Sequence, residues 1–172
     1  MATMNSSRPD AVRAFTLIEL VVVLAIIGIL ATIATPTLID RVIREQVQEG
    51  EKMAEVAQRA VGTIYAAKGA MPVDNASSGL PQPEKMVGDL VESVHVKEGA
   101  VTVVYGNNAN SALKGKKLTW RPSIAPNVKV LGIEWLCHQR PVPEGREAQG
   151  KLETDIEERY LPLKCRDMKK KT

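Results

Sequence analysis

The sequence predicts an α+β protein in which one long N-terminal helix packs on a four-stranded antiparallel sheet. Two patterns indicate this fold. In the first 67 positions, apolar residues form an unbroken run and then recur every three or four residues, and further along the chain they alternate with polar ones. With 172 residues, 44% of them hydrophobic, the chain can form one domain and an extra element. A charged fraction of 25% excludes a protein that crosses a membrane many times.

The first element is an apolar stretch at residues 15–39, which we expect to be a transmembrane helix. Its only charged residue is Glu19, and the twenty residues after Glu19 carry none. About 20 apolar residues span a bilayer as a helix. Arg8 and Arg13 precede the stretch, so the positive-inside rule keeps the N-terminus cytoplasmic. A secretory signal peptide is the alternative, but the run is long for one and no clear A-x-A site ends it.

Glu19 does not suit a simple anchor. An ionised carboxylate at the bilayer centre costs roughly 2.5–3.5 kcal/mol by insertion scales, and less near an interface, so the residue needs a partner. If the chain is cut before Phe15, that residue carries a free α-amine, and residues four apart share a helix face. The amine that pairs with Glu19 then belongs to the same chain or to a neighbouring copy, and only the second arrangement drives assembly.

The residues around Glu19 resemble the start of a type IV prepilin. The resemblance rests on a basic leader, on AFTLIEL at positions 14–20, and on VVVLAIIGILATIATP directly after it. It implies that residues 1–14 are a leader peptide. It also implies that a membrane prepilin peptidase cuts between Ala14 and Phe15 and N-methylates Phe15.

Two features of the leader depart from the family pattern. Ala14 stands where a glycine normally precedes the cut, and we expect slower cleavage. The leader is also rather long and contains Asp10, and translation from Met4 would shorten it.

Gly28 and Pro36 interrupt the apolar half of the helix. Pro36 lacks an amide hydrogen and breaks one backbone hydrogen bond. The stretch is therefore either an ordinary kink or a segment that extends once it packs among other helices. Many members of the resembling family have a glycine and a proline here, which makes Glu19, Gly28 and Pro36 the expected assembly residues.

The second half of the helix, residues 40–67, is predicted to be amphipathic. Its apolar residues recur at a spacing of three or four, and charged residues occupy the opposite face. The apolar positions are Leu38, Val42, Val47, Met53 or Ala54, Ala57, Val61, Ile64 and Tyr65. Gly50 is a weak point within this half. The charged face is either a solvated surface or a set of contacts between copies, and the residues alone leave both open.

Residues 68–172 form the predicted globular body. It opens with a loop rich in Gly, Pro, Asn and Ser at Lys68–Pro83. Four strands are predicted after the loop, at Leu90–Lys97, Ala100–Tyr105, Lys117–Arg121 and Val128–Cys137. A turn at Glu98-Gly99 joins the first two strands into a hairpin. One face of this sheet is apolar, and the amphipathic half of the helix can cover it.

Two cysteines, Cys137 and Cys165, allow one disulfide in the oxidising compartment outside a bacterial inner membrane. A zinc site with His95 and His138 is the weaker alternative, because no other residue has ligand spacing. The order of KGAMPVDNASSGL, VKEGAVTVVYG, LKGKKLTWRP and GIEWLC resembles the body of a type IVa major pilin. The resemblance implies that Cys137 and Cys165 close a C-terminal loop in which His138–Lys164 is variable and exposed.

Two surface features carry weaker predictions. Asn75-Ala76-Ser77 is a glycosylation sequon by pattern, and Ser77 or Ser78 could carry a glycan. The basic C-terminal tail is either a solvated end or a contact for DNA. A net charge of only +3 and the shortage of aromatic residues give DNA binding little support.

The sequence therefore predicts a structural subunit of a type IV pilus, most simply the major one, with no catalytic residues, metal or cofactor. Its expected partners are other pilin subunits, the prepilin peptidase, the assembly platform of the inner membrane and minor pilins. We expect it in the inner membrane before assembly and in an extracellular filament afterwards, supporting adhesion, twitching motility or DNA uptake. The alternatives are a type II secretion pseudopilin, a minor pilin that binds DNA or a surface, and a simple anchored domain.

Overall fold

The computed structural model describes residues 15–126 and 132–166, without the side chains of residues 33–37. The chain divides into two compact units, one ending at Leu38 and the other beginning at Ile39. Helix α1, Leu17–Lys68, is 52 residues long and contributes to both units. In the described part of the chain, with residues 33–37 left out, no helix contains a stretch long and apolar enough to cross a membrane.

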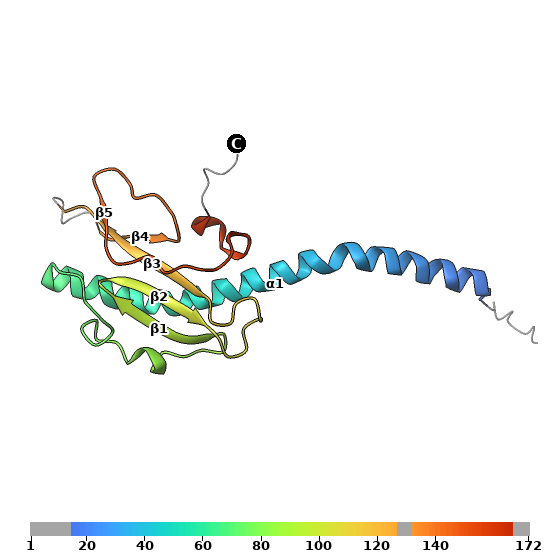
Figure 1. The fold of residues 1–172 in the computed structure, drawn as a ribbon, viewed down its shortest axis with the longest axis horizontal. Helices are drawn as coiled ribbons and strands as arrows, with labels where there is room; N and C mark the ends of the chain where they lie inside the picture. Colours follow the sequence, from blue (N-terminus) through green and yellow to red (C-terminus); the bar gives the residue numbers. More distant parts are fainter. Residues whose placement is uncertain (1–14, 127–131, 167–172) are drawn as a thin grey trace, which may run out of the picture. The chain divides into compact units, whose positions relative to one another are not determined.

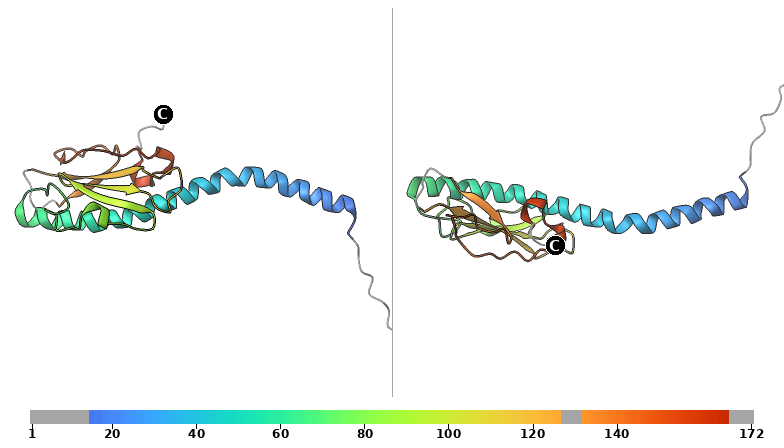
Figure 2. Two further views of the ribbon diagram at one scale, coloured as in Figure 1. Left: turned by 60° about the horizontal axis from the view of Figure 1, so that its bottom comes forward. Right: turned by 90° about the horizontal axis from the view of Figure 1, so that it is seen from above.

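The second unit contains an antiparallel sheet in the order β1-β2-β3-β4. The strands are β1 (Val91–Lys97), β2 (Ala100–Tyr105), β3 (Lys117–Ile124) and β4 (Glu134–Cys137), and the short β5 (Glu147–Ala148) pairs with the end of β3. Three short 3-10 helices complete it: η1 (Pro83–Lys85), η2 (Glu158–Tyr160) and η3 (Leu163–Cys165). Figures 1 and 2 show the later part of α1 along one face of the sheet, which confirms the predicted α+β fold.

The buried stripe of α1 faces the sheet, and its phase differs from the predicted one. The fully buried positions are Ile43, Val47, Gly50, Ala54, Ala57 and Val61. Their spacing of four and three residues keeps them on one side of the helix. The expected burial of Val42 and Leu38 is therefore wrong: Val42 is 49% exposed and Leu38 is also exposed. Ile43, one helical step of about 100° from Val42, takes the buried place.

The hairpin of β1 and β2 forms where the sequence predicts it. Glu98 and Gly99 both have positive φ, 50° and 80°. A two-residue turn with both central residues in this region matches the twist of the flanking strands, and Gly99 adopts it without steric cost. The register then pairs Val96 with Val101 and Lys97 with Ala100.

The side chain of Asn75 closes the free edge of β1. Its amide donates to the carbonyl of Val94 (2.9 Å) and accepts from the amide of Val96 (2.6 Å), as a neighbouring strand would. Asn75 is only 5% exposed and Ser78 is buried as well. The folded protein therefore leaves the side chains of Asn75 and Ser78 little exposed to a glycosylating enzyme, whereas Ser77 is half-buried.

Strand boundaries differ from prediction near the C-terminal half of the sheet. β3 continues to Ile124, three residues beyond the predicted end. Pro122 has no amide hydrogen to donate, but its carbonyl accepts a hydrogen bond from the backbone amide of Gln149 (2.9 Å), so the strand tolerates the proline there. The predicted strand from Val128 begins at Glu134 in the structure, and residues 127–131 lie outside the described residues. The pairing of β5 with β3 was not predicted.

Candidate assembly surface on the N-terminal helix

The start of α1 is organised by Thr16 and Glu19. The amide of Glu19 bonds to the Thr16 hydroxyl oxygen (3.3 Å). In return, Glu19 Oε2 accepts from the amide (3.5 Å) and the hydroxyl (3.4 Å) of Thr16. This reciprocal arrangement is a capping box, and the acidic group also lies in the first turn, where the helix dipole favours it. The T-x-x-E spacing is visible in the sequence, but the prediction for this segment depends only on the charge of Glu19 and does not include Thr16.

The charge of Glu19 is not neutralised within the described chain. The groups that contact its carboxylate belong to Thr16, which is neutral, and no ion pair joins Glu19 to another described residue. Phe15, four residues before Glu19, is exposed. The arrangement therefore holds an uncompensated negative charge in the same helical turn as the position that would become the chain end after cleavage.

The following four turns of α1 present apolar side chains in every direction. The large ones are between 47% and 81% exposed: Leu17, Ile18, Leu20, Val21, Val22, Val23, Leu24, Ile26, Ile27, Ile29 and Leu30. A helix that is apolar all round is stable in water only when other helices or lipid cover it. This surface is therefore one that a partner or a membrane must bury.

Gly28 lies within this surface and has open space around it. A Cβ atom placed there would meet nothing within 4 Å, so no contact within the described subunit requires a glycine. Small residues on apolar helices permit close approach of a second helix. The Pro36 side chain and Ala14 lie outside the described residues, although α1 continues through position 36.

In the second unit, a glycine of α1 is required by packing. The ring of Tyr105, on β2, occupies the space where a Cβ of Gly50 would stand. The Tyr105 hydroxyl donates to the carbonyl of Val47 (2.7 Å). Burial raises the pKa of the Tyr105 phenol far above its usual range, and the negative charge of Glu51 adds to this effect. Gly50, expected to be a weak point, is thus the position that lets β2 approach the helix.

The C-terminal segment is fastened to the same part of α1. Cys137 and Cys165 form the predicted disulfide, with Cα atoms 5.1 Å apart, so the zinc alternative is wrong. Beside it, Lys164 Nζ lies 2.6 Å from Glu51, whose side chain is only 12% exposed. Nearby, Arg44 Nε donates to the carbonyl of Arg159 (3.0 Å).

The region predicted as an exposed loop is partly core. Ile156, Tyr160 and Leu161 are buried, because the disulfide and the contacts with α1 hold this segment against the sheet. His95 bonds through Nε2 to the hydroxyl of Ser93 (3.0 Å). No group of potential metal ligands occurs among the described residues. The basic tail after Arg166 lies outside them.

Comparison with known proteins identifies the family. Residues 44–166 match the family Pilin (bacterial filament), and residues 10–35 match the prokaryotic N-terminal methylation motif. The chain belongs to the pilin family. A fimbrial protein of Neisseria meningitidis is 38% identical over 166 residues, which cover 90% of this pilin and 94% of the relative.

Two further relatives align over a similar share of the chain. The type IV major pilin protein PilE1 of Neisseria gonorrhoeae is 38% identical over 161 residues, covering 90% of this pilin and 94% of its own length. The type IV major fimbrial protein FimA of Dichelobacter nodosus is 29% identical over 174 residues, covering 90% and 96%. The pilin is thus a structural subunit of a type IV pilus, and such subunits polymerise into extracellular filaments.

Proposed function

We propose that this pilin is the major subunit of its filament and that it assembles through the apolar half of α1. The support is the surface from Leu17 to Leu30, which is apolar on all sides and carries one carboxylate. In the precursor, residues 15–39 lie in the inner membrane with the N-terminus cytoplasmic, where lipid covers the surface. In the filament, the same residues of neighbouring copies cover one another, so no apolar area returns to water.

Processing prepares the charge partner for Glu19. A prepilin peptidase removes residues 1–14 by cutting between Ala14 and Phe15, and then methylates the new amine of Phe15. The match of residues 10–35 to the methylation motif supports this step. We divide the chain into leader 1–14, assembly half 15–39, amphipathic half 40–67 and body 68–172, and cleavage sets the first of these boundaries.

Glu19 then selects the position of the incoming subunit. Before assembly its carboxylate contacts only neutral donors of Thr16. A methylated amine keeps its positive charge, and in surroundings of low dielectric constant an unpaired charge is strongly unfavourable. Meeting the Phe15 amine of a neighbour satisfies both charges, which favours one axial register over the others. The assembly platform of the inner membrane delivers the subunits, and minor pilins take part; the role of this chain is structural and not catalytic.

The test replaces Glu19 by Ala or Gln and compares both with Glu49→Gln, an exposed glutamate on the second half of α1. We expect cleavage and methylation, measured by intact mass, to be normal in all three. Filaments sheared from cells should fall at least about tenfold for both Glu19 variants and stay unchanged for Glu49→Gln. Normal filament yield with Glu19→Gln would show that its charge does not set the register.

A further inference from the structure

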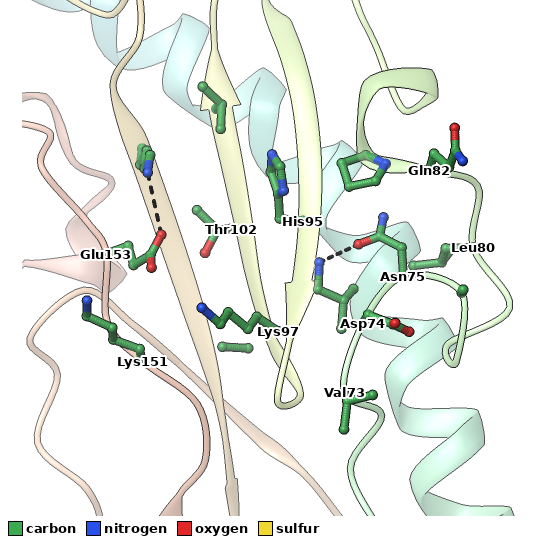
Figure 3. Close-up of a pocket in the computed structure, with 16 residues that line it drawn as sticks. Val73, Asp74, Asn75, Leu80, Gln82, His95, Lys97, Thr102, Lys151 and Glu153 are labelled. Carbon is green, nitrogen blue, oxygen red and sulfur yellow. Dashed lines mark hydrogen bonds and ion pairs between the residues drawn. The ribbon is translucent and has the colours of Figure 1, made fainter.

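A trough lies on the face of the sheet that is turned away from α1. Its cavity volume is about 660 Å³. The floor comes from β1 and β2, one wall from the loop at residues 73–83, and the other wall from residues 151–153. Figure 3 shows both walls with α1 behind the strands. A cavity of this size fits ligands of several hundred daltons.

The trough is lined by both apolar and polar side chains. Ala100, Val104, Leu80 and Pro83 supply aliphatic surface. His95, on β1, lies on the floor of the trough. Gln82 lies at the rim, and its side-chain amide can both donate and accept hydrogen bonds. This mixture of aliphatic surface and hydrogen-bonding side chains suits a ligand that has both apolar faces and hydroxyl groups.

The charged residues of the lining carry a small positive excess. Three lysines, Lys97, Lys117 and Lys151, face two carboxylates, Asp74 and Glu153. Glu153 has a cationic partner, whereas Asp74 accepts a hydrogen bond from a neutral group and keeps its negative charge. Lys117 Nζ lies 3.5 Å from Glu153, and Asp74 Oδ1 accepts from the amide of Ser77 (2.7 Å), which lowers the pKa of Asp74.

The other two lysines remain available for a ligand. No ion pair joins Lys97 or Lys151 to another described residue. Figure 3 shows the Lys97 side chain extended across the floor toward the wall that carries Lys151. Two ammonium groups that line one open trough favour an anionic ligand.

Two classes of anionic polymer fit poorly. An acidic peptide that adds to the sheet would need the edge of β1, and Asn75 already occupies the carbonyl of Val94 and the amide of Val96. A single nucleic-acid strand relies on aromatic side chains that stack with its bases, and the described residues lining the trough include no Phe, Tyr or Trp.

We propose that the trough binds an acidic oligosaccharide. Its carboxylates pair with Lys97 and Lys151, its hydroxyls bond to Gln82 and His95, and the aliphatic faces of its rings cover Ala100 and Val104. This inference goes beyond the role of the chain as a filament subunit, because the site lies wholly within the body of one subunit.

The test uses the full-length processed chain in detergent micelles and a hexamer of galacturonic acid, with binding measured by calorimetry. We expect saturable binding that weakens as salt rises. The double variant Lys97→Gln/Lys151→Gln should bind at least about tenfold more weakly. The control Lys68→Gln/Lys114→Gln removes the same charge from two exposed lysines outside the trough and should change affinity less than about twofold.

Three outcomes would overturn the proposal. The first is equal loss in the two double variants, which would indicate attraction by net charge alone. The second is unchanged binding by the trough variant. The third is tighter binding of a hexathymidylate or a hexaglutamate than of the uronate. The same variants should form normal filaments, so that failure here leaves the subunit's assembly role untouched.

Discussion

The two halves of α1 use apolar residues for opposite purposes. Between Leu17 and Leu30 the large apolar side chains are exposed, whereas between Ile43 and Val61 five apolar residues are at most 2% exposed. The second half is buried by its own sheet, and the first half has no such cover in the described subunit. Substitutions in the second half should therefore change the unfolding free energy, and substitutions in the first half should change assembly instead.

The largest expected effect on stability comes from the disulfide that holds the C-terminal segment beside the second half. Cys137→Ser/Cys165→Ser should lower the unfolding free energy by about 2–5 kcal/mol, because the 28-residue separation leaves a long loop unrestrained in the unfolded chain. Guanidinium unfolding of the full-length chain in micelles, followed by tryptophan fluorescence, measures it. A loss below about 1 kcal/mol would show that Lys164 and Arg44 hold the segment without the bond.

Two of the three glycines of α1, Gly28 and Gly50, give the most direct contrast between its halves. Gly50→Ala should cost about 1–3 kcal/mol, because the new Cβ overlaps the Tyr105 ring. Gly28→Ala should keep or raise stability by up to about 1 kcal/mol, because its Cβ meets nothing within 4 Å and alanine favours helix.

Filament yield measured alongside stability sharpens this contrast. Gly28→Ala should reduce sheared filaments if a neighbouring helix approaches there, while its unfolding midpoint stays normal. Equal destabilisation by the two substitutions would contradict the division of α1 that we describe.

A smaller effect follows from the hydroxyl of Tyr105. Tyr105→Phe removes its bond to Val47 and should cost about 0.5–1.5 kcal/mol near neutral pH. The folded protein keeps the phenol protonated because its pKa is raised, while the unfolded chain releases the proton near pH ~10. The stabilisation is thus complete below that pH and is lost above it, by up to about 1.4 kcal/mol per pH unit.

The pH dependence can be measured as the difference between two proteins. Unfolding curves of the wild type and of Tyr105→Phe between pH 9 and 11 should converge as the pH rises. Parallel curves over this range would mean that Tyr105 titrates alike in the folded and unfolded chain.

Two ion pairs of α1 complete the series, and the exposed pair between Arg41 and Glu45 has the smallest expected effect. Lys164→Gln should cost about 1 kcal/mol or slightly more, because Glu51 is mostly buried and loses its cationic partner. Arg41→Gln, at an exposed pair with Glu45, should cost less than about 0.5 kcal/mol. Thermal unfolding of both variants at low and high salt distinguishes them, and equal costs would show that burial does not matter at this site.

The sequence predicts elements that depend on neighbours along the chain. The long helix, the Glu98-Gly99 hairpin and the order of the strands follow from periodicity and turn chemistry. The phase of the buried stripe did not follow, because Val42 and Ile43 are adjacent, both apolar, and only the sheet decides between them. Nor did the roles of Gly50 and Asn75, since each depends on a partner at least 19 positions away.

Only some of the site residues could be predicted, because others depend on contacts that the sequence does not show. Glu19 is conspicuous because a charge interrupts an apolar run, and Cys137 and Cys165 are the only two cysteines. Thr16 was missed although its spacing to Glu19 is local, because its contribution is a hydrogen bond rather than a charge. The trough could not be predicted, since its walls come from segments about 75 residues apart that meet only in the folded body.

A fibre repeats the surface of its subunit many hundreds of times, so a small defect in one copy becomes a continuous stripe. An exposed strand edge would then recur along the whole fibre, and such edges on two fibres could pair and cause irreversible aggregation. In each copy the Asn75 side chain occupies the carbonyl of Val94 and the amide of Val96, so this part of the β1 edge is closed to pairing with a strand of another fibre.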